Sequence, residues 1–478
     1  MKVHWREALS RLFHNIREEC GVFGIYGHAE AANHAYLGLY ALQHRGQEGA
    51  GICSSDGNSL YLEKAMGHVS EVFSEKRLKR LPGMAAIGHN RYSTAGGSHL
   101  KNVQPLMVNF SLGSLAIAHN GNLTNAFALK TQLEKEGAIF QSNSDSEVIV
   151  HLIAHSREET AQDKIIDAVN QIKGAFSLLI LREKELYAVR DPHGVRPLSI
   201  GLLGDAFVAA SETCALDLIG ATYIRDVEPG EMVRICDNGI DSIKINPAKK
   251  KAHCVFEFIY FSRPDSNIFG GVNVHTVRKE LGRQLALESY QDADVVIPVP
   301  DSGVPATLGY ANESGIPLDF GLVRNHYIGR TFIEPKQSIR HFGVKIKLNP
   351  VRQILQGKRV VVVDDSIVRG TTSKKIIKMI RETGQAKEIH MRISSPSTIG
   401  PCFYGIDTPT RGELIASTHM TDEIRKFITA DSLAYLSMEG LRSVIPNPDD
   451  YCYACFTKHY PITFPQEEQY SQLELSFV

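Results

Sequence analysis

The segment VVVVDDSIVRGTTS, residues 360–373, limits the fold of this chain more than any other stretch. Four consecutive valines indicate a strand buried on both faces, as in a parallel sheet that helices cover on each side. Asp364 and Asp365 follow the valines directly. Because parallel sheets bind ligands beyond the carboxyl ends of their strands, we expect both aspartates at the mouth of a site and not in the core.

A short loop and a helix come after the two aspartates. Residues 369–373 are an arginine, a glycine and three hydroxyl residues, and isoleucines at 376, 377 and 380 fall on one face of the predicted helix. Backbone N–H groups at a helix start, with hydroxyls beside them, bind phosphate. Carboxylates beside such a site indicate a phosphorylated sugar and a divalent cation. For the aspartates alone, acidic capping of a helix start fits equally well.

The chain of 478 residues is long enough for two or three domains, and the rhythm of its sequence changes midway. From Cys20 to about Arg234, short β-like runs alternate with glycine and asparagine turns and helical stretches, which is typical of an α+β fold. After a lysine-containing linker at 245–253, strands alternate with helices, which indicates parallel βαβ units. We expect segments at residues 1–19, 20–245, 254–461 and 462–478.

Composition narrows the class of protein. The chain is 43% hydrophobic and 22% charged, with a formal net charge of −1 and no basic run, so binding to a nucleic acid backbone has no electrostatic support. No apolar stretch is long enough to cross a membrane, and residues 1–19 lack the apolar region of a secretory signal. We therefore expect a cytoplasmic protein, whose eight cysteines are thiols or metal ligands and not disulfides.

The second half resembles the type I phosphoribosyltransferases, on the strength of residues 360–373. In that family the acids bind the ribose hydroxyls and the small-residue loop binds the 5-phosphate of phosphoribosylpyrophosphate. The segment DVVIPVPDSGVPATLGYA resembles the loop that meets pyrophosphate, which implies a place near Mg²⁺ for Ser302 beside the aspartates, and residues 323–350 resemble the mobile loop of these enzymes. The residues implied to bind the substrate are Asp364, Asp365, Arg369, Gly370, Thr371 and Thr372.

The first half carries a different resemblance. The motifs EECGVFGI, GHNRYSTAG, AHNGNLTN and SNSDSE, in this order, resemble the glutaminase domain of amidotransferases that use an N-terminal cysteine. The resemblance implies the following roles: Cys20 as the nucleophile, Arg91 and Thr94 for the α-carboxylate of glutamine, Asp145 for its α-amino group, and Asn120 and Gly121 as the oxyanion hole.

In that family the base is the α-amino group of the cysteine itself. A free α-amine has a pKa of about 8 and can hold a proton near neutral pH, whereas an amide nitrogen cannot. With Glu19 attached, Cys20 would have no internal base. The resemblance therefore implies self-cleavage between Glu19 and Cys20, which makes residues 1–19 a propeptide. The alternative is that Met1 remains the N-terminus and glutaminase activity is absent.

From Cys20 to about Pro461 the chain resembles the glutamine phosphoribosylpyrophosphate amidotransferases. The family implies a four-layer αββα glutaminase domain of the N-terminal-nucleophile type joined to an α/β phosphoribosyltransferase domain. It implies transfer of ammonia from glutamine to phosphoribosylpyrophosphate, the first committed step of purine synthesis, with AMP and GMP as feedback inhibitors and a homotetramer. Amidotransferases that make glucosamine 6-phosphate or asparagine differ in the second half, and a non-catalytic regulator would not need Cys20.

Four cysteines form a separate pattern: Cys452 and Cys455 in a C-x2-C motif, with Cys254 and Cys402 far away in the sequence. The spacing alone suits structural zinc, a [4Fe–4S] cluster or a redox pair. One branch of the family has four cysteines at matching motifs and holds a [4Fe–4S] cluster, so the resemblance implies that cluster here.

Overall fold

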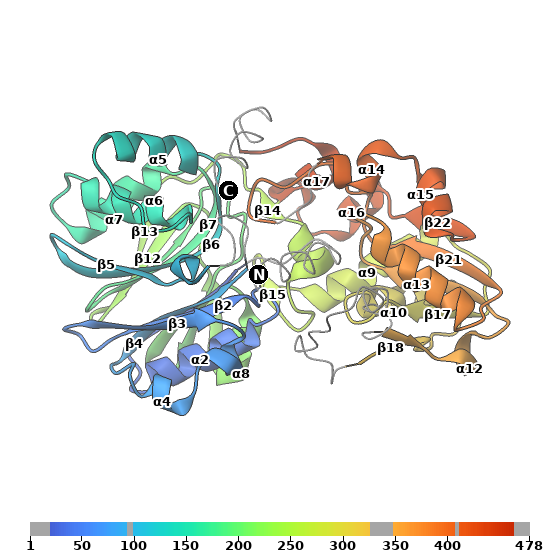
Figure 1. Cartoon of the computed structure of the whole chain (residues 1–478), viewed down its shortest axis with the longest axis horizontal. Helices are drawn as coiled ribbons and strands as arrows, with labels where there is room; N and C mark the ends of the chain where they lie inside the picture. The colour runs from blue at the N-terminus through green and yellow to red at the C-terminus, as the bar shows by residue number, and fades with distance from the viewer. Residues whose placement is uncertain (1–19, 93–98, 326–347, 407–410, 463–478) are drawn as a thin grey trace, which may run out of the picture.

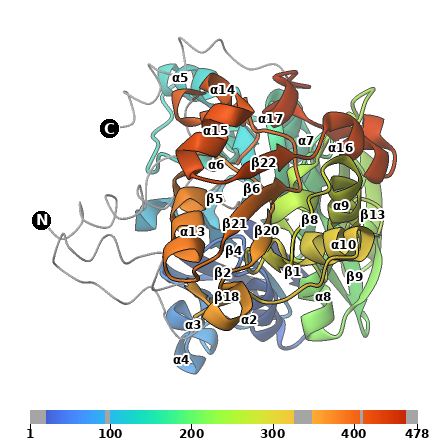
Figure 2. The same ribbon diagram turned by 90° about the vertical axis from the view of Figure 1, so that its right-hand side faces the viewer.

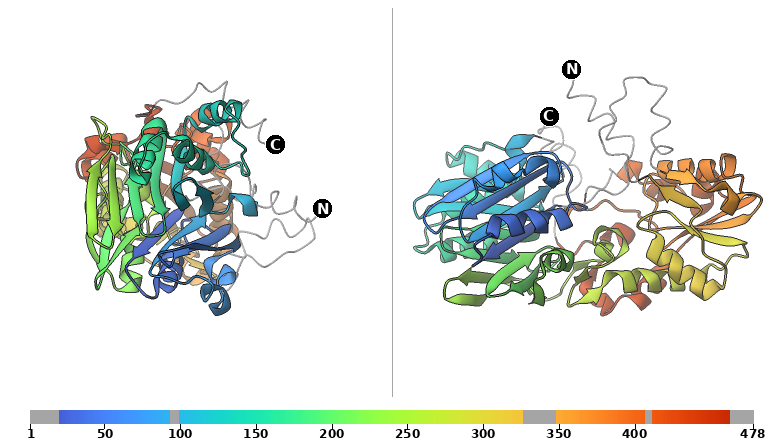
Figure 3. Two further views of the ribbon diagram at one scale, coloured as in Figure 1. Left: turned by 90° about the vertical axis from the view of Figure 1, so that its left-hand side faces the viewer. Right: turned by 90° about the horizontal axis from the view of Figure 1, so that it is seen from below.

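The computed structural model describes residues 20–92, 99–325, 348–406 and 411–462. Several segments named in the sequence analysis lie outside these ranges: residues 1–19, Thr94, most of residues 323–350, and residues 463–478. The described chain forms two halves that lie side by side (Figures 1 and 3).

The first half contains two antiparallel sheets packed face to face (Figure 1). One sheet has the order β11-β9-β10-β1-β4-β2-β3 and the other β13-β12-β8-β7-β6-β5. The bounds of the first are β1 Gly21–Tyr26, β2 Gly49–Ser55, β3 Leu60–Met66, β4 Ala85–Arg91, β9 Ser199–Leu203, β10 Ala206–Ala210 and β11 Thr222–Asp226. Those of the second are β5 Leu106–Phe110, β6 Gly113–Leu123, β7 Gly174–Leu181, β8 Leu186–Arg190, β12 Glu231–Cys236 and β13 Gly239–Lys244.

Helices cover the outer face of each sheet. On the first sheet lie α2 (Ala31–Ala41) and α8 (Thr213–Ile219), with the short helices α3 (Val69–Val72) and α4 (Glu75–Leu78) nearby. On the second lie α5 (Ala126–Lys135), α6 (Ser146–His155) and α7 (Ala161–Gln171). A third apolar cluster, which includes Val22, Ile87 and Leu179, fills the space between the sheets. The four layers expected for an αββα sandwich are therefore present.

The second half is built on a parallel sheet of order β17-β20-β21-β22 (Figure 2). Its strands are β17 Val295–Pro298, β20 Arg359–Asp364, β21 Glu388–Ile393 and β22 Ser432–Tyr435. Because side chains alternate along a strand, Val361 and Val363 of β20 pack with α9 (Val274–Glu288) and α10 (Val304–Ser314). Val360 and Val362 pack on the other side with α13 (Thr371–Glu382) and α15 (Thr421–Ile428). The doubly covered strand predicted from the four valines is confirmed.

The chain returns to the domain junction near its C-terminus. The strand β14 (His253–Cys254) pairs in parallel with β23 (Tyr451–Cys452), next to the π-helix η2 (Glu257–Phe261), α16 (Met438–Val444) and α17 (Ala454–Thr457). The remaining short elements are η1 Leu100–Asn102, β15 Asn267–Ile268, β16 Val272–Asn273, β18 Leu322–Arg324, β19 Leu348–Pro350, α12 Arg352–Leu355, η4 Arg411–Glu413, α14 Ile415–Thr418 and η5 Pro448–Asp450. No helix among the described residues is both long enough and apolar enough to span a membrane.

Candidate active sites

The first candidate site surrounds Cys20, which directly precedes β1. Its side chain is 9% exposed, and its Sγ lies 3.5 Å from both the backbone N and the O of Tyr92. Burial raises the pKa of the thiol to about 11, against the fields of the Tyr92 backbone and of Arg91, which lower it. A thiol held in this way is a poor nucleophile unless a base removes its proton.

The predicted glutamine-binding residues gather around this thiol. Arg91, at the end of β4, and Asp145, at the start of α6, both act electrostatically on Cys20. The Asp145 carboxylate accepts a hydrogen bond from the backbone N–H of Leu123 at 2.9 Å, which fixes it against the end of β6. A buried guanidinium and a carboxylate near one thiol suit the two charged groups of an amino acid. Thr94 lies outside the described residues.

The predicted oxyanion hole lies on β6. The Asn120 side chain is fully buried and its amide donates to Ser211 Oγ at 3.4 Å, while Ser211 Oγ accepts from the N–H of Val22 at 3.0 Å. Ser211 therefore connects Asn120 with the strand that begins beside Cys20. Gly121 has φ +148°, and a Cβ at this position would lie 2.0 Å from Ala175 O, so only glycine fits here.

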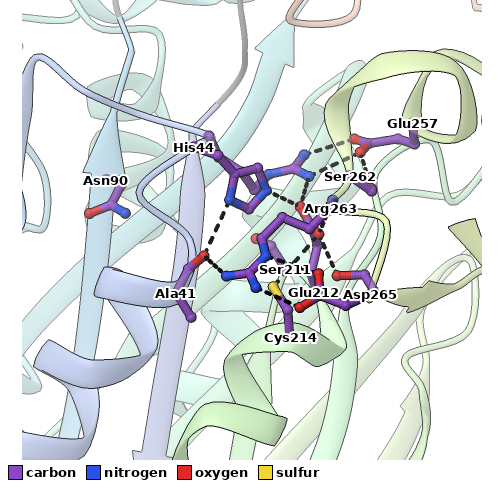
Figure 4. A network of polar contacts seen from close by, with 12 residues as sticks. Ala41, His44, Asn90, Ser211, Glu212, Cys214, Glu257, Ser262, Arg263 and Asp265 are labelled. Carbon is purple, nitrogen blue, oxygen red and sulfur yellow. Dashed lines mark hydrogen bonds and ion pairs between the residues drawn. The ribbon is translucent and has the colours of Figure 1, made fainter. Parts of the chain in front are cut away.

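Behind Cys20 a network of buried charges joins the two halves of the molecule (Figure 4). The guanidinium of Arg45 donates to the carbonyl of Cys20 at 3.3 Å, to Glu212 at 2.6 Å and to both oxygens of Glu257 at 2.7 and 2.9 Å. Glu257 belongs to η2 of the second half and also accepts from Arg196 at 3.2 Å. Because charge pairs and hydrogen bonds outweigh burial here, the pKa of Glu257 is held below its ordinary value.

The second candidate site lies at the carboxyl end of β20. A pocket there is lined by Asp364 and residues 366–373, and Gly370 opens α13 with φ +73°. The Arg369 guanidinium pairs with Glu413 at 2.8 Å. From the loop between β17 and α10, Ser302 Oγ donates to Asp365 at 2.5 Å. The structure therefore brings the predicted sugar, phosphate and pyrophosphate segments to one edge of the sheet.

The two aspartates are more enclosed than the sequence suggests. We expected them at the mouth of a site, and Asp364 does line the pocket, but only 8% of Asp364 and 6% of Asp365 is exposed. Burial, together with the adjacent Asp365, raises the pKa of Asp364 well above its usual range, and burial also raises that of Asp365. The reason for the difference is local: Ser302, Ser366 and the Asp365 backbone N–H cover the carboxylates with hydrogen bonds.

The four cysteines singled out in the sequence meet at the junction of the halves. Cys254 pairs with Cys452 across β14 and β23, Cys455 follows in α17, and all four belong to or pack against one apolar cluster. Burial, with a smaller effect of neighbouring cysteines of the set, raises the pKa of Cys254 and of Cys452 to about 12. Among the described residues, no three or more His, Cys, Asp or Glu side chains form a group that could hold a metal ion.

Comparisons with known proteins agree with this two-site arrangement. A glutamine amidotransferase domain matches residues 89–218, and a phosphoribosyl transferase domain matches residues 274–394. The amidophosphoribosyltransferase of Bacillus subtilis strain 168 is 54% identical over 458 residues, covering 95% of this chain and 96% of that protein. This chain belongs to the amidophosphoribosyltransferase family. A chloroplastic amidophosphoribosyltransferase of Arabidopsis thaliana is also 54% identical, covering 95% of this chain and 81% of that one.

Solved structures place the amidophosphoribosyltransferase fold over nearly the whole chain. One, described as the allosteric regulatory enzyme of purine biosynthesis, has a TM-score of 0.90 at 54% identity, covering 94% of this chain and 97% of that one. The glutamine phosphoribosylpyrophosphate amidotransferase of B. subtilis, complexed with ADP and GMP, has a TM-score of 0.89 at 53% identity, covering 94% and 98%. The expected fold class, a glutaminase sandwich joined to a phosphoribosyltransferase, is confirmed.

Sequence reasoning missed the buried charge network. Glu257 carried a usable signal, because it interrupts the otherwise apolar run CVFEFIYF and a charge at such a position needs a partner. Arg45, Ser211 and Glu212 carried none, since their partners come from strands and helices far away in the sequence.

Proposed function

We propose that this enzyme hydrolyses glutamine at Cys20 and transfers the ammonia to 5-phosphoribosyl 1-pyrophosphate. The products are glutamate, pyrophosphate and 5-phosphoribosylamine, as in the first committed step of purine biosynthesis. One observation carries the proposal: two sites occur together in a chain that is 54% identical to an amidophosphoribosyltransferase. One site is a buried thiol on which Arg91 and Asp145 act electrostatically, and the other is a loop that follows two aspartates at the end of a strand.

At the glutaminase site, the α-amine of Cys20 would take the thiol proton once residues 1–19 are removed. Arg91, with Thr94, would bind the α-carboxylate of glutamine, and Asp145 its α-amino group. As the thiolate attacks the side-chain amide, negative charge develops on oxygen, and the amide of Asn120 and the N–H of Gly121 would stabilise it. One fixed donor of this kind contributes about 3 kcal/mol.

Cleavage between Glu19 and Cys20 is supported by the high pKa of the buried thiol, which needs a base at hand. Mass spectrometry of active enzyme tests this. A mature N-terminus at Cys20 is expected, and fully active enzyme that begins at Met1 would overturn the proposal.

At the phosphoribosyl site, Asp364 and Asp365 would bind the ribose hydroxyls, and the backbone and hydroxyls of residues 369–372 would bind the 5-phosphate. Mg²⁺ in such sites is bound by one or two carboxylates completed by substrate phosphates, and two adjacent carboxylates are present here. Asp364, Asp365 and Ser302 would hold it, and it would neutralise charge on the departing pyrophosphate.

A [4Fe–4S] cluster on Cys254, Cys402, Cys452 and Cys455 is supported by the donor chemistry, four thiols in one apolar cluster. Because each thiolate of such a cluster binds a different iron, the ligands need not converge on one point as they do around a single ion. The cluster would fasten the C-terminal segment to the domain junction. Brown protein absorbing near 400 nm, with four irons per chain, is expected; colourless protein that contains zinc would overturn this assignment.

Two further properties rest on the family. Purine nucleotides, AMP and GMP among them, would inhibit the enzyme by feedback, which the ADP and GMP complex of the B. subtilis relative supports. A homotetrameric, cytoplasmic enzyme is likewise proposed, and analytical ultracentrifugation tests the assembly.

The activity itself is tested by pyrophosphate release. We expect release from phosphoribosylpyrophosphate to need either glutamine or an ammonium salt as nitrogen donor. Replacing Cys20 by alanine should abolish the glutamine-dependent reaction and spare the ammonium-dependent one. Glutamine-dependent release that survives this substitution would overturn the proposal.

A further inference from the structure

The residue that follows the oxyanion-hole glycine reaches across to the second half of the molecule. The side-chain amide of Asn122 donates to the carbonyl of Phe403 at 3.0 Å, although the two residues are 281 positions apart in the sequence. Asn122 lies on β6 next to Gly121, whereas Phe403 lies in the loop after β21. A hydrogen bond at this place connects the predicted oxyanion hole with the phosphoribosyltransferase half.

A backbone contact lies beside this hydrogen bond. Gly405 has φ +106°, and a Cβ added there would lie 3.0 Å from the carbonyl carbon and 3.2 Å from the Cα of Gly121. On its other side Gly121 meets Ala175 of β7. The backbone of Gly121 is therefore enclosed between its own sheet and residues 403–405, and two glycines are needed for the approach.

Residues 403–405 are themselves fixed in place. The carbonyl of Tyr404 accepts two hydrogen bonds from the buried guanidinium of Arg196, at 2.9 and 3.3 Å. The Tyr404 hydroxyl donates to the carbonyl of Ile462 at 2.8 Å. Since Arg196 also pairs with Glu257, the loop belongs to the same buried framework as the charge network behind Cys20.

We propose that residues 403–405 of the phosphoribosyltransferase half position the oxyanion hole of the glutaminase half, with Asn122 and Gly405 as positioning residues. The inference rests on the proposed glutaminase function. An oxyanion donor works only when its N–H is aimed at the place where charge develops. The pairing of β6 with β7 holds the Gly121 backbone on one side, and the loop from the other half closes against it as well. Loss of the loop contact would then destabilise the transition state more than it weakens the binding of glutamine.

Asn122→Ala and Gly405→Ala test this in mature enzyme. Asn122→Ala removes one bond that orients the hole, so we expect kcat with glutamine to fall about tenfold, less than the 10²–10³ lost when a donor is deleted. The KM for glutamine should change less than about twofold, because Arg91 and Asp145 are untouched. Gly405→Ala pushes against Gly121 directly and should lower kcat more than Asn122→Ala does.

Asn125→Ala is the matched control. Its amide also donates to a backbone carbonyl, that of Gln171 at 2.9 Å, but the bond stays within the glutaminase half. We expect kcat with glutamine to be unchanged in this variant.

Two readouts separate positioning from general damage. Alkylation of Cys20 by iodoacetamide displaces iodide from carbon and puts no charge on the carbonyl oxygen, so its rate, followed by peptide mass spectrometry, should be unchanged. Synthesis from an ammonium salt bypasses Cys20 and should also be unchanged. The proposal is wrong if Asn122→Ala keeps kcat within twofold, or if alkylation and ammonium-dependent synthesis fall together with kcat. Failure of the proposed function would instead appear in the unmodified enzyme, as no glutamine turnover at all.

Discussion

Glu257 offers the sharpest test of how the two halves are held together. Each of its carboxylate oxygens faces a guanidinium: Oε1 accepts from Arg45 and Arg196, and Oε2 accepts from Arg45 and from Ser262 at 2.6 Å. In Glu257→Gln, one of the two oxygens is replaced by an NH₂ group, which is a hydrogen-bond donor. At either position this donor would face the N–H groups of Arg45, in a site that is buried from solvent. The variant keeps the shape of the side chain and removes its charge.

The expected loss of stability in Glu257→Gln follows from the burial of the three charged side chains. Glu257 and Arg196 are fully buried and Arg45 is 1% exposed, and loss of one partner from a buried pair costs about 3–5 kcal/mol. At a slope of about 3 kcal/mol per molar urea, the unfolding midpoint should fall by roughly 1 M or more. Glu75→Gln is the matched control, because its pair with Lys79 is exposed and such pairs contribute less than about 1 kcal/mol.

Urea unfolding followed by circular dichroism measures both variants, and a pH series checks the cause. Because the pKa of Glu257 is held below its ordinary value of 4.5, its stabilisation is complete above that pH and is lost as the pH falls through the lowered value. When the pH is lowered from 5, the free energy of unfolding should therefore fall less in the Glu257→Gln variant than in the unmodified chain. A Glu257→Gln midpoint equal to that of Glu75→Gln would refute the reasoning.

Three further outcomes are expected. Asn120→Ala should lower kcat with glutamine by about 10²–10³ while ammonium-dependent synthesis survives, and an equal loss of both activities would contradict its role as a donor. Gly370→Ala should destabilise the loop by about 1–2 kcal/mol and raise the KM for phosphoribosylpyrophosphate, because φ +73° strains any other residue; an unchanged KM would count against it. Burial raises the pKa of Asp364, so binding of Mg²⁺ and substrate should release protons. Calorimetry in two buffers of different ionisation enthalpy should therefore give different heats of binding, and identical heats would exclude proton release.

The sequence predicted the elements that carry chemistry and missed those that join them. The four valines at 360–363 predicted a strand covered on both faces, because the side-chain pattern of a buried strand can be recognised from the local sequence. The end of this strand in turn predicted the position of Asp364 and of the loop after it. The enclosure of the two aspartates was missed, since Ser302, which hydrogen-bonds to Asp365, comes from the loop after β17, far away in the sequence. The contact of Asn122 with Phe403 was missed because the two residues are 281 positions apart in the sequence.

The parallel pairing of β14 with β23 makes the second half a closed loop of chain, in which residues about two hundred positions apart lie against each other. A fragment cut at the limits of the matched phosphoribosyl transferase domain, residues 274–394, would lack both of these strands, β22 and the π-helix that carries Glu257. Such a fragment would expose the apolar cluster that the two ends jointly cover. Any attempt to dissect the enzyme should therefore keep the chain continuous from the linker to Ile462.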